Sequence, residues 1–65
     1  MENKSYEVVM FSEGERTILH TGTWGDCMSY TDEYVRKVGG YKNRCSFNEW
    51  ILNSSGRVWV NRAGY

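Results

Sequence analysis

One stretch with helical periodicity, residues 24–38, constrains the fold more than any other feature of this chain. When the stretch is wound at 100° per residue, its apolar and small side chains form one stripe: Cys27, Met28, Thr31, Tyr34, Val35 and Val38, with Tyr30 at the edge. Thr23 precedes Asp26 by three residues, which fits a capping box, and Gly39 is a typical helix end. We therefore predict one helix over residues 24–38.

The segments on both sides of this helix have the β-branched and aromatic composition of strand pairs. Residues 6–21 predict a hairpin that turns at Gly14 in a left-handed conformation. If Gly14 is a bulge glycine, Val8 and Met10 share a face with Ile18 and His20. Residues 46–62 predict a second hairpin around the turn 53–56.

The turn type of the second hairpin decides which tryptophans it exposes. A type I turn ending at Gly56 pairs Leu52 with Val58 and Trp50 with Val60, and these four then face the helix. The far side of the sheet then carries Phe47, Ile51 and Trp59. A plain two-residue turn instead pairs Trp50 and Trp59 on the outside, so in either case a tryptophan lies on the face that the helix does not cover.

These elements describe one α+β domain over residues 1–65, with an N-terminal tail (1–5) and a basic loop (39–45) outside the regular structure. The expected order is ββαββ, with a four-stranded, mostly antiparallel sheet and one helix packed on one face. This order resembles the β-grasp arrangement of ubiquitin and of immunoglobulin-binding protein G domains, in which the first and last strands run parallel at the centre of the sheet. The resemblance implies a fold that works by binding, and it assigns no site residue.

A second resemblance concerns the joint between the first hairpin and the helix. The run Thr21-Gly22-Thr23-Trp24, followed by Cys27 and Tyr30, is similar to the strand-to-helix joint of short accessory proteins encoded by bacteriophages. The similarity implies a role in interfering with a host factor. It transfers no functional residue.

The composition favours a cytoplasmic protein. The first residues lack the basic start and apolar core of a secretion signal, and no apolar run approaches the roughly 20 residues that cross a bilayer. We therefore expect no membrane contact, with Cys27 and Cys45 as free thiols instead of a disulfide. The charge is unevenly distributed: two bases and seven acids lie in residues 1–33, and six bases and one acid in residues 34–65. The two halves either attract each other in the fold or create a dipole that orients the protein on a charged partner.

The sequence offers little for catalysis. Its one histidine, His20, and its two cysteines lack the spacing of a zinc site, and the glycine pair at 39–40 follows a helix, whereas phosphate loops precede one. We predict a non-enzymatic protein with no metal and no cofactor. A cysteine-dependent enzyme using Cys27 or Cys45 with His20 remains the third hypothesis.

Two segments have the composition of a binding site. In one, four bases surround an aromatic in the glycine-loosened stretch 36–44, which is typical of a nucleic-acid contact; its residues are Arg36, Lys37, Tyr41, Lys42 and Arg44. In the other, the uncovered sheet face presents apolar side chains beside bases, which is typical of a protein interface. The favoured hypothesis is a protein-binding module that acts as an inhibitor by occluding a partner's surface, through Tyr41, Lys42, Arg44, Ile51, Arg57 and Trp59. The alternative is a small nucleic-acid-binding protein, and a homodimer through the uncovered face also stays open.

Overall fold

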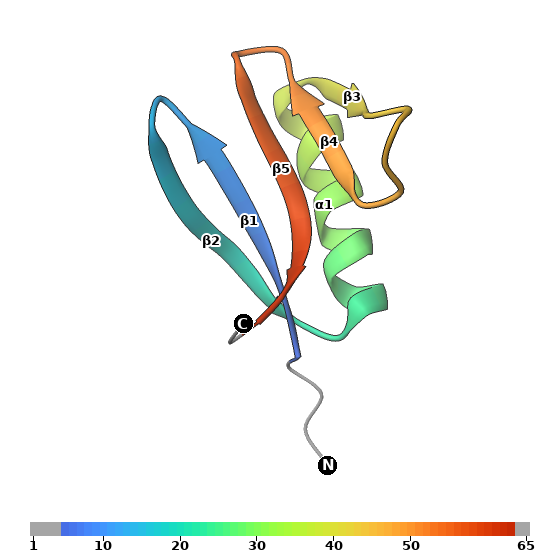
Figure 1. Cartoon of the computed structure of the whole chain (residues 1–65). Coiled ribbons are helices and arrows are strands. Elements are labelled where there is room, and N and C mark those ends of the chain that lie inside the picture. Colours follow the sequence, from blue (N-terminus) through green and yellow to red (C-terminus); the bar gives the residue numbers. More distant parts are fainter. Residues whose placement is uncertain (1–4, 64–65) are drawn as a thin grey trace.

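The computed structural model describes residues 5–63, which form a five-stranded antiparallel sheet with one helix on one face (Figure 1). The predicted tail falls mostly on residues 1–4, which lie outside the described residues. The elements in chain order are β1 (Tyr6–Ser12), β2 (Glu15–Gly22), α1 (Trp24–Val38), β3 (Gly40–Lys42), β4 (Glu49–Leu52) and β5 (Gly56–Arg62). The strands lie in the order β2-β1-β5-β4-β3, and α1 contacts all five. The α+β class with one helix covering one face of the sheet is confirmed.

The helix α1 has the predicted bounds and the predicted start and stop. Thr23 accepts a hydrogen bond at its side chain from the Asp26 backbone N–H, and Gly39 at φ 100° donates its N–H to the Val35 carbonyl. This positive φ is why a glycine ends the helix. Cys27, Thr31 and Val35 of the predicted stripe are buried, and Met28 and Tyr34 pack against the core, so this part of the stripe faces the sheet. Val38, which was predicted to share the stripe, is 51% exposed.

The core lies between α1 and the sheet. It contains Val8, Cys27, Val35, Trp50, Leu52, Val58 and Val60. Val58 and Val60 alternate with exposed or half-buried residues along β5, as expected for a strand with one covered face. The predicted helix-facing set of the second hairpin, Trp50, Leu52, Val58 and Val60, is therefore confirmed.

The prediction of four strands is wrong because the basic loop contains a strand. Gly40–Lys42 pairs antiparallel with β4, placing Gly40 opposite Leu52 and Tyr41 opposite Ile51. This extra strand also reverses the direction in which the last strand runs. The expected parallel pair of a β-grasp sheet is consequently wrong as well, since β1 and β5 pair antiparallel at the centre of the sheet.

The two hairpins differ from their predicted registers. The first turns through Glu13 (φ 53°) and Gly14 (φ 78°), a two-residue turn with both residues left-handed. The two-residue turn pairs Met10 with Thr17 and Val9 with Ile18, so Ile18 lies on the face opposite to the one expected. The bulge lies between the Val9–Ile18 and Val8–His20 pairs and not at Gly14, so His20 shares the face of Val8 as expected.

The second hairpin turns at Ser55, whose φ of 76° is left-handed, and pairs Trp50 with Val58. The register differs by two residues from the expected one, and an even shift keeps each side chain on its face. Phe47 precedes β4, which begins at Glu49 and not at residue 46. Its ring lies 5.9 Å from that of Trp24 on α1, so it is not on the far side of the sheet.

Candidate functional site

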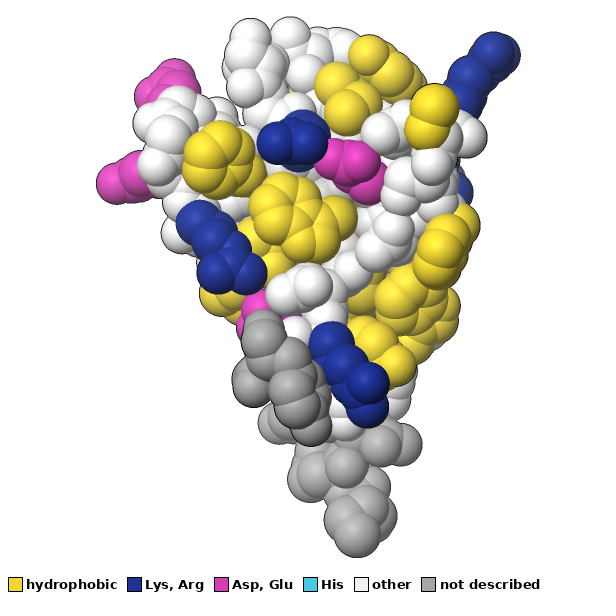
Figure 2. Space-filling model, in the orientation of Figure 1, with side chains coloured by type: hydrophobic (Ala, Val, Ile, Leu, Met, Phe, Trp, Pro, Cys, Tyr) yellow, Lys and Arg dark blue, Asp and Glu magenta, His cyan; other side chains and the backbone are white. Residues whose placement is uncertain are grey.

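The side of the sheet opposite α1 has no element packed on it among the described residues, and we call it the open face. Figure 2 views this face, where hydrophobic side chains are interspersed with basic and acidic ones. The strand registers arrange it in rows across the sheet. The first row is Arg16, Phe11, Arg57, Ile51 and Tyr41, the second is Ile18, Val9, Trp59 and Glu49, and the third is Thr21, Glu7 and Asn61.

The first row combines bases and apolar groups. Phe11 on β1 lies between Arg16 on β2 and Arg57 on β5, and Ile51 and Tyr41 continue the row across β4 and β3. Phe11 is 38% exposed and Tyr41 is 59% exposed. The first row therefore exposes both guanidinium groups and apolar surface to solvent across the whole sheet.

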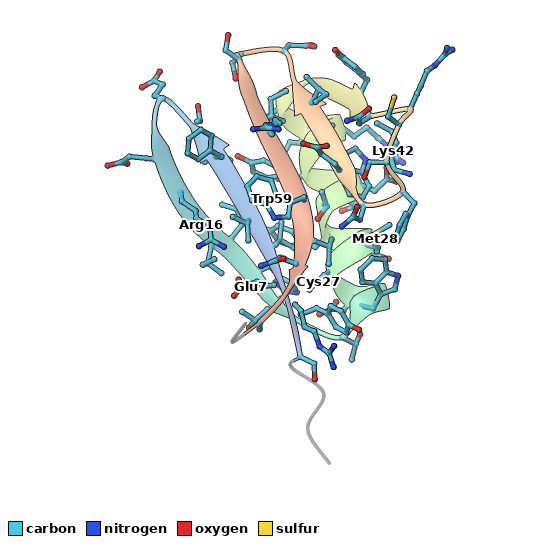
Figure 3. The ribbon with its side chains drawn as sticks, viewed as in Figure 1. Glu7, Arg16, Cys27, Met28, Lys42 and Trp59 are labelled. Carbon is cyan, nitrogen blue, oxygen red and sulfur yellow. The ribbon has the colours of Figure 1, made fainter. Side chains whose placement is uncertain are left out.

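The second row forms the apolar centre of the open face. Val9 has no exposed surface although no helix covers it, because its cross-strand neighbours Ile18 and Trp59 lie on either side of it. Trp59 itself is half-buried, and Figure 3 shows it on the central strand β5. Trp59 thus serves both as part of this small second core and as an accessible aromatic surface.

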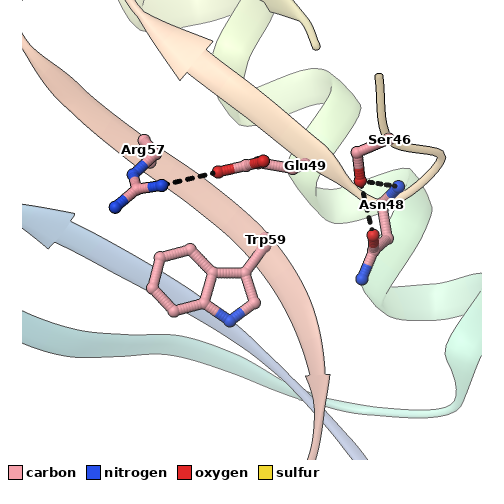
Figure 4. A pocket seen from close by; sticks show the side chains of 5 residues that line it. All are labelled: Ser46, Asn48, Glu49, Arg57 and Trp59. Carbon is pink, nitrogen blue, oxygen red and sulfur yellow. Dashed lines mark hydrogen bonds and ion pairs between the residues drawn. The ribbon is translucent and has the colours of Figure 1, made fainter. Parts of the chain in front are cut away.

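A hollow of about 340 Å³ lies beside Trp59 on this face (Figure 4). Ser46, Asn48, Glu49, Arg57 and Trp59 line it. The Arg57 Nη1 atom lies 3.4 Å from Glu49 Oε2, and the other Glu49 oxygen accepts a hydrogen bond of 2.9 Å from Asn43 Nδ2.

Asn48 holds the wall of this hollow in place. Its Nδ2 donates to the Val60 carbonyl at 2.9 Å, and its Oδ1 accepts from Ser46 Oγ at 2.8 Å. The Val60 N–H in turn donates to the Asn48 carbonyl at 3.1 Å. These bonds tie the segment before β4 to β5, so the hollow is formed before any partner arrives.

The structure brings together four of the six residues predicted for protein binding. Tyr41, Ile51, Arg57 and Trp59 share the open face. Lys42 lies on the other side of β3, with its Nζ atom 5.4 Å from the centre of the Trp50 ring, a cation–π contact. Arg44 lies in the exposed turn after β3.

The five residues of the predicted nucleic-acid site are only partly brought together. Arg36, Tyr41 and Lys42 border a hollow of about 150 Å³, which Asp32 also lines. Arg36 pairs with that carboxylate at 2.7 Å, which neutralises one of the bases. Lys37 and Arg44 do not line this hollow.

The residues considered for catalysis have structural surroundings. His20 Nε2 lies 2.8 Å from Asp26 Oδ2, and its ring stacks on Tyr30 with the centroids 4.4 Å apart. Cys27 is fully buried, and burial, followed by the charges of Asp26 and Glu7, raises the pKa of its thiol. A raised pKa lowers the thiolate fraction that a nucleophile needs. Cys45 is exposed, and neither cysteine is in a disulfide.

Three contributors to the open face were not predicted from the sequence: Arg16, Phe11 and Ile18. Phe11 alternates with Val9 and Glu7 along β1, and this alternation was the available signal. It was obscured because Val8 and Val9 are adjacent and both fully buried, so β1 has no polar face near its centre. Ile18 was assigned to the opposite face because the bulge was expected at Gly14, whereas it lies between the Val9–Ile18 and Val8–His20 pairs.

No protein-family model, curated protein or solved structure matches this chain. Between residues 5 and 63, no helix is long and apolar enough to span a membrane. In the same part of the chain, no three side chains of the kinds that bind metals gather into a possible metal site.

Proposed function

We propose that this chain is a small non-enzymatic protein-binding module that acts by covering a surface of its partner with the open face. The observation that carries the proposal is the composition of that face: Trp59, Tyr41 and the two arginines of the first row are the residue types that dominate the energetic centres of protein interfaces. They lie around Val9, which its cross-strand neighbours Ile18 and Trp59 already bury. The unpaired cysteines agree with a cytoplasmic location, where thiols stay reduced.

The test is affinity capture of cytoplasmic proteins by the tagged chain, with nuclease present, read by mass spectrometry. Tyr41→Ala and Trp59→Ala are expected to lower the retained partner at least tenfold. Phe47→Ala is the matched control, because Phe47 is an aromatic that is 71% exposed and lies away from the open face. Each variant is first checked for its fold by circular dichroism. If the folded Tyr41→Ala and Trp59→Ala variants retain the partner as well as Phe47→Ala does, the open face is not the binding surface.

The inhibitor role adds one requirement to this proposal. Covering a surface is stoichiometric, so the partner's own activity should fall linearly with added chain until the two are equimolar. An inhibitor of a host factor, as in the bacteriophage proteins that the joint at Thr21–Trp24 resembles, would behave in this way. Loss of activity at far less than one chain per partner would indicate catalysis instead.

The alternative is a nucleic-acid-binding protein, which the hollow bordered by Arg36, Tyr41 and Lys42 favours. It predicts an affinity that falls steeply with salt, because each neutralised phosphate releases counterions. The pI of about 6.5 is low for such a protein. Capture that collapses under nuclease would select this alternative.

A further inference from the structure

We propose that the open face binds an acidic segment of the partner, with carboxylates on Arg16 and Arg57 and an apolar side chain between them on Phe11. This inference rests on the proposed protein-binding function and specifies the partner's chemistry. Its basis is the first row, in which one aromatic on β1 lies between two arginines on β2 and β5.

Arg16 has its charge unneutralised. It is exposed on β2, the outermost strand of the sheet, and among the described residues its side chain makes no hydrogen bond or ion pair. Glu7 lies on the same face two rows away and makes no ion pair with it. An incoming carboxylate therefore displaces only water from Arg16.

Arg57 is held in position while most of its donors remain available. Only its Nη1 atom contacts Glu49, at 3.4 Å, whereas a guanidinium carries five N–H donors. The Glu49 carboxylate accepts from Asn43 and from Arg57, and its side chain is 20% exposed, whereas that of Arg57 is 57% exposed. A group that enters the hollow beside Trp59 therefore meets the exposed guanidinium more readily than the carboxylate, which favours an anionic group.

The size of the open face indicates that it binds one segment of the partner and not a broad surface. Neighbouring strands lie about 4.8 Å apart and residues about 3.4 Å apart along a strand, so five strands of this length offer a face of roughly 20 by 20 Å. That is about half of the roughly 800 Å² that each partner contributes to a standard interface. Arg16 and Arg57 stand two strands apart, or about 10 Å, so the matching carboxylates lie on the two sides of one apolar side chain.

A second copy and a nucleic acid fit these observations less well. A nucleic acid repeats phosphates along its whole length and would meet Glu7 and Glu49 on the same face. A second copy would bring its own Arg16 and Arg57 to this face, where two arginines already lie. An acidic segment needs to contact only the first row.

The probe is a display library of random twelve-residue peptides, selected on the immobilised full-length chain and sequenced against the starting library. We expect the enriched peptides to carry two or more carboxylates with an aromatic or aliphatic residue between them. The affinity of a synthesised winner is then measured on four variants: Arg16→Gln, Arg57→Gln, both together, and Lys37→Gln as a matched control on α1. The double variant should weaken binding about tenfold or more, and Lys37→Gln by less than twofold.

Two results would overturn the inference while leaving the proposed function intact: enrichment of neutral or basic peptides, or acidic peptides that bind the double variant normally but lose affinity with Trp59→Ala. Peptides indifferent to Trp59→Ala, Tyr41→Ala and the double variant would reject both proposals. Binding of a uridine 20-mer that competes with the peptide and is stronger than it at 150 mM salt would reassign the face to nucleic acid. Failure of any peptide to enrich over the starting library would also overturn the inference.

Discussion

Replacing Gly40 with alanine should destabilise the fold by about 1 to 3 kcal/mol, the usual cost of forcing extra atoms into a packed site. A Cβ atom on Gly40 would lie 2.5 Å from the Ile51 carbonyl oxygen and 2.9 Å from Val35 Cγ1. The carbonyl belongs to the backbone of β4, and Val35 is buried on α1. Neither can move aside by a rotamer change alone, so β3 has to shift away from its neighbours.

Gly25 supplies the matched control for this prediction. It lies in the first turn of α1, and a Cβ atom there would have nothing within 4 Å. Alanine is favoured over glycine in a helix by about 0.5 to 1 kcal/mol, so Gly25→Ala should stabilise. The same added methyl group is therefore expected to change the free energy of unfolding in opposite directions, with the two variants about 1.5 to 4 kcal/mol apart.

The assay is urea unfolding at equilibrium, followed by tryptophan fluorescence and by far-ultraviolet circular dichroism. A Gly40→Ala variant within about 0.5 kcal/mol of wild type would refute the packing of β3 between α1 and β4. It would also remove the reason for assigning Tyr41 to the open face, because the side of β3 on which Tyr41 lies depends on that pairing.

Three further predictions follow from the packing. Under native conditions a thiol reagent should modify exposed Cys45 quickly and buried Cys27 only after unfolding; equal rates would contradict the burial of Cys27. Because burial raises the pKa of Cys27, the unfolded chain loses this proton first, so stability should fall as the pH rises above about 9 and less so in Cys27→Ala; parallel curves for the two proteins would contradict this. Asn48→Asp should cost about 1 to 3 kcal/mol at pH 7, because the donor to the Val60 carbonyl is lost and an oxygen replaces it; unchanged unfolding would show that this bond does not hold the loop.

The helix and the first turn were predictable because their signals are local. Thr23 marks the start of α1 because its side chain accepts from the Asp26 N–H, and Gly39 marks the end because its φ is positive. Gly14 marks the first turn because it occupies a left-handed conformation. Each signal depends on residues within one turn of the chain, which is the range over which sequence patterns specify backbone geometry.

The features that were not predictable depend on contacts between distant segments. Gly40–Lys42 has too few residues for an alternating pattern, and it becomes a strand because β4 lies beside it. Ser55, and not Gly56, takes the left-handed position of the second turn. Gly56 is needed for another reason, since a Cβ atom there would lie 3.1 Å from the Phe11 carbonyl oxygen on β1. The sequence shows the glycine, but it does not show that the fold brings the Phe11 carbonyl next to it.

The candidate site was predictable in part for the same reason. Ile51 and Trp59 follow from alternation within one hairpin, and the assignment survived a register error of two residues because an even shift preserves the face. Arg16 and Phe11 join them only through the pairing of β1 with β5. The row of two arginines and three apolar side chains is a property of the sheet order, which no single segment specifies.

Because Val9 is buried on the open face, Trp59 has two roles there: it covers Val9, and it is part of the proposed contact surface. Trp59 and Ile18 cover Val9 completely, so truncating Trp59 exposes part of a core as well as removing a contact surface. A half-buried tryptophan at such a site costs about 2 kcal/mol on truncation to alanine, less than a fully buried one, and a 65-residue domain has little stability to spare. Tyr41 is more exposed and lies on the outermost strand at the other edge, so its loss should leave folding almost unchanged. Loss of binding in Tyr41→Ala is therefore the observation that assigns function to the open face, whereas loss in Trp59→Ala has that meaning only when the variant is shown to be folded.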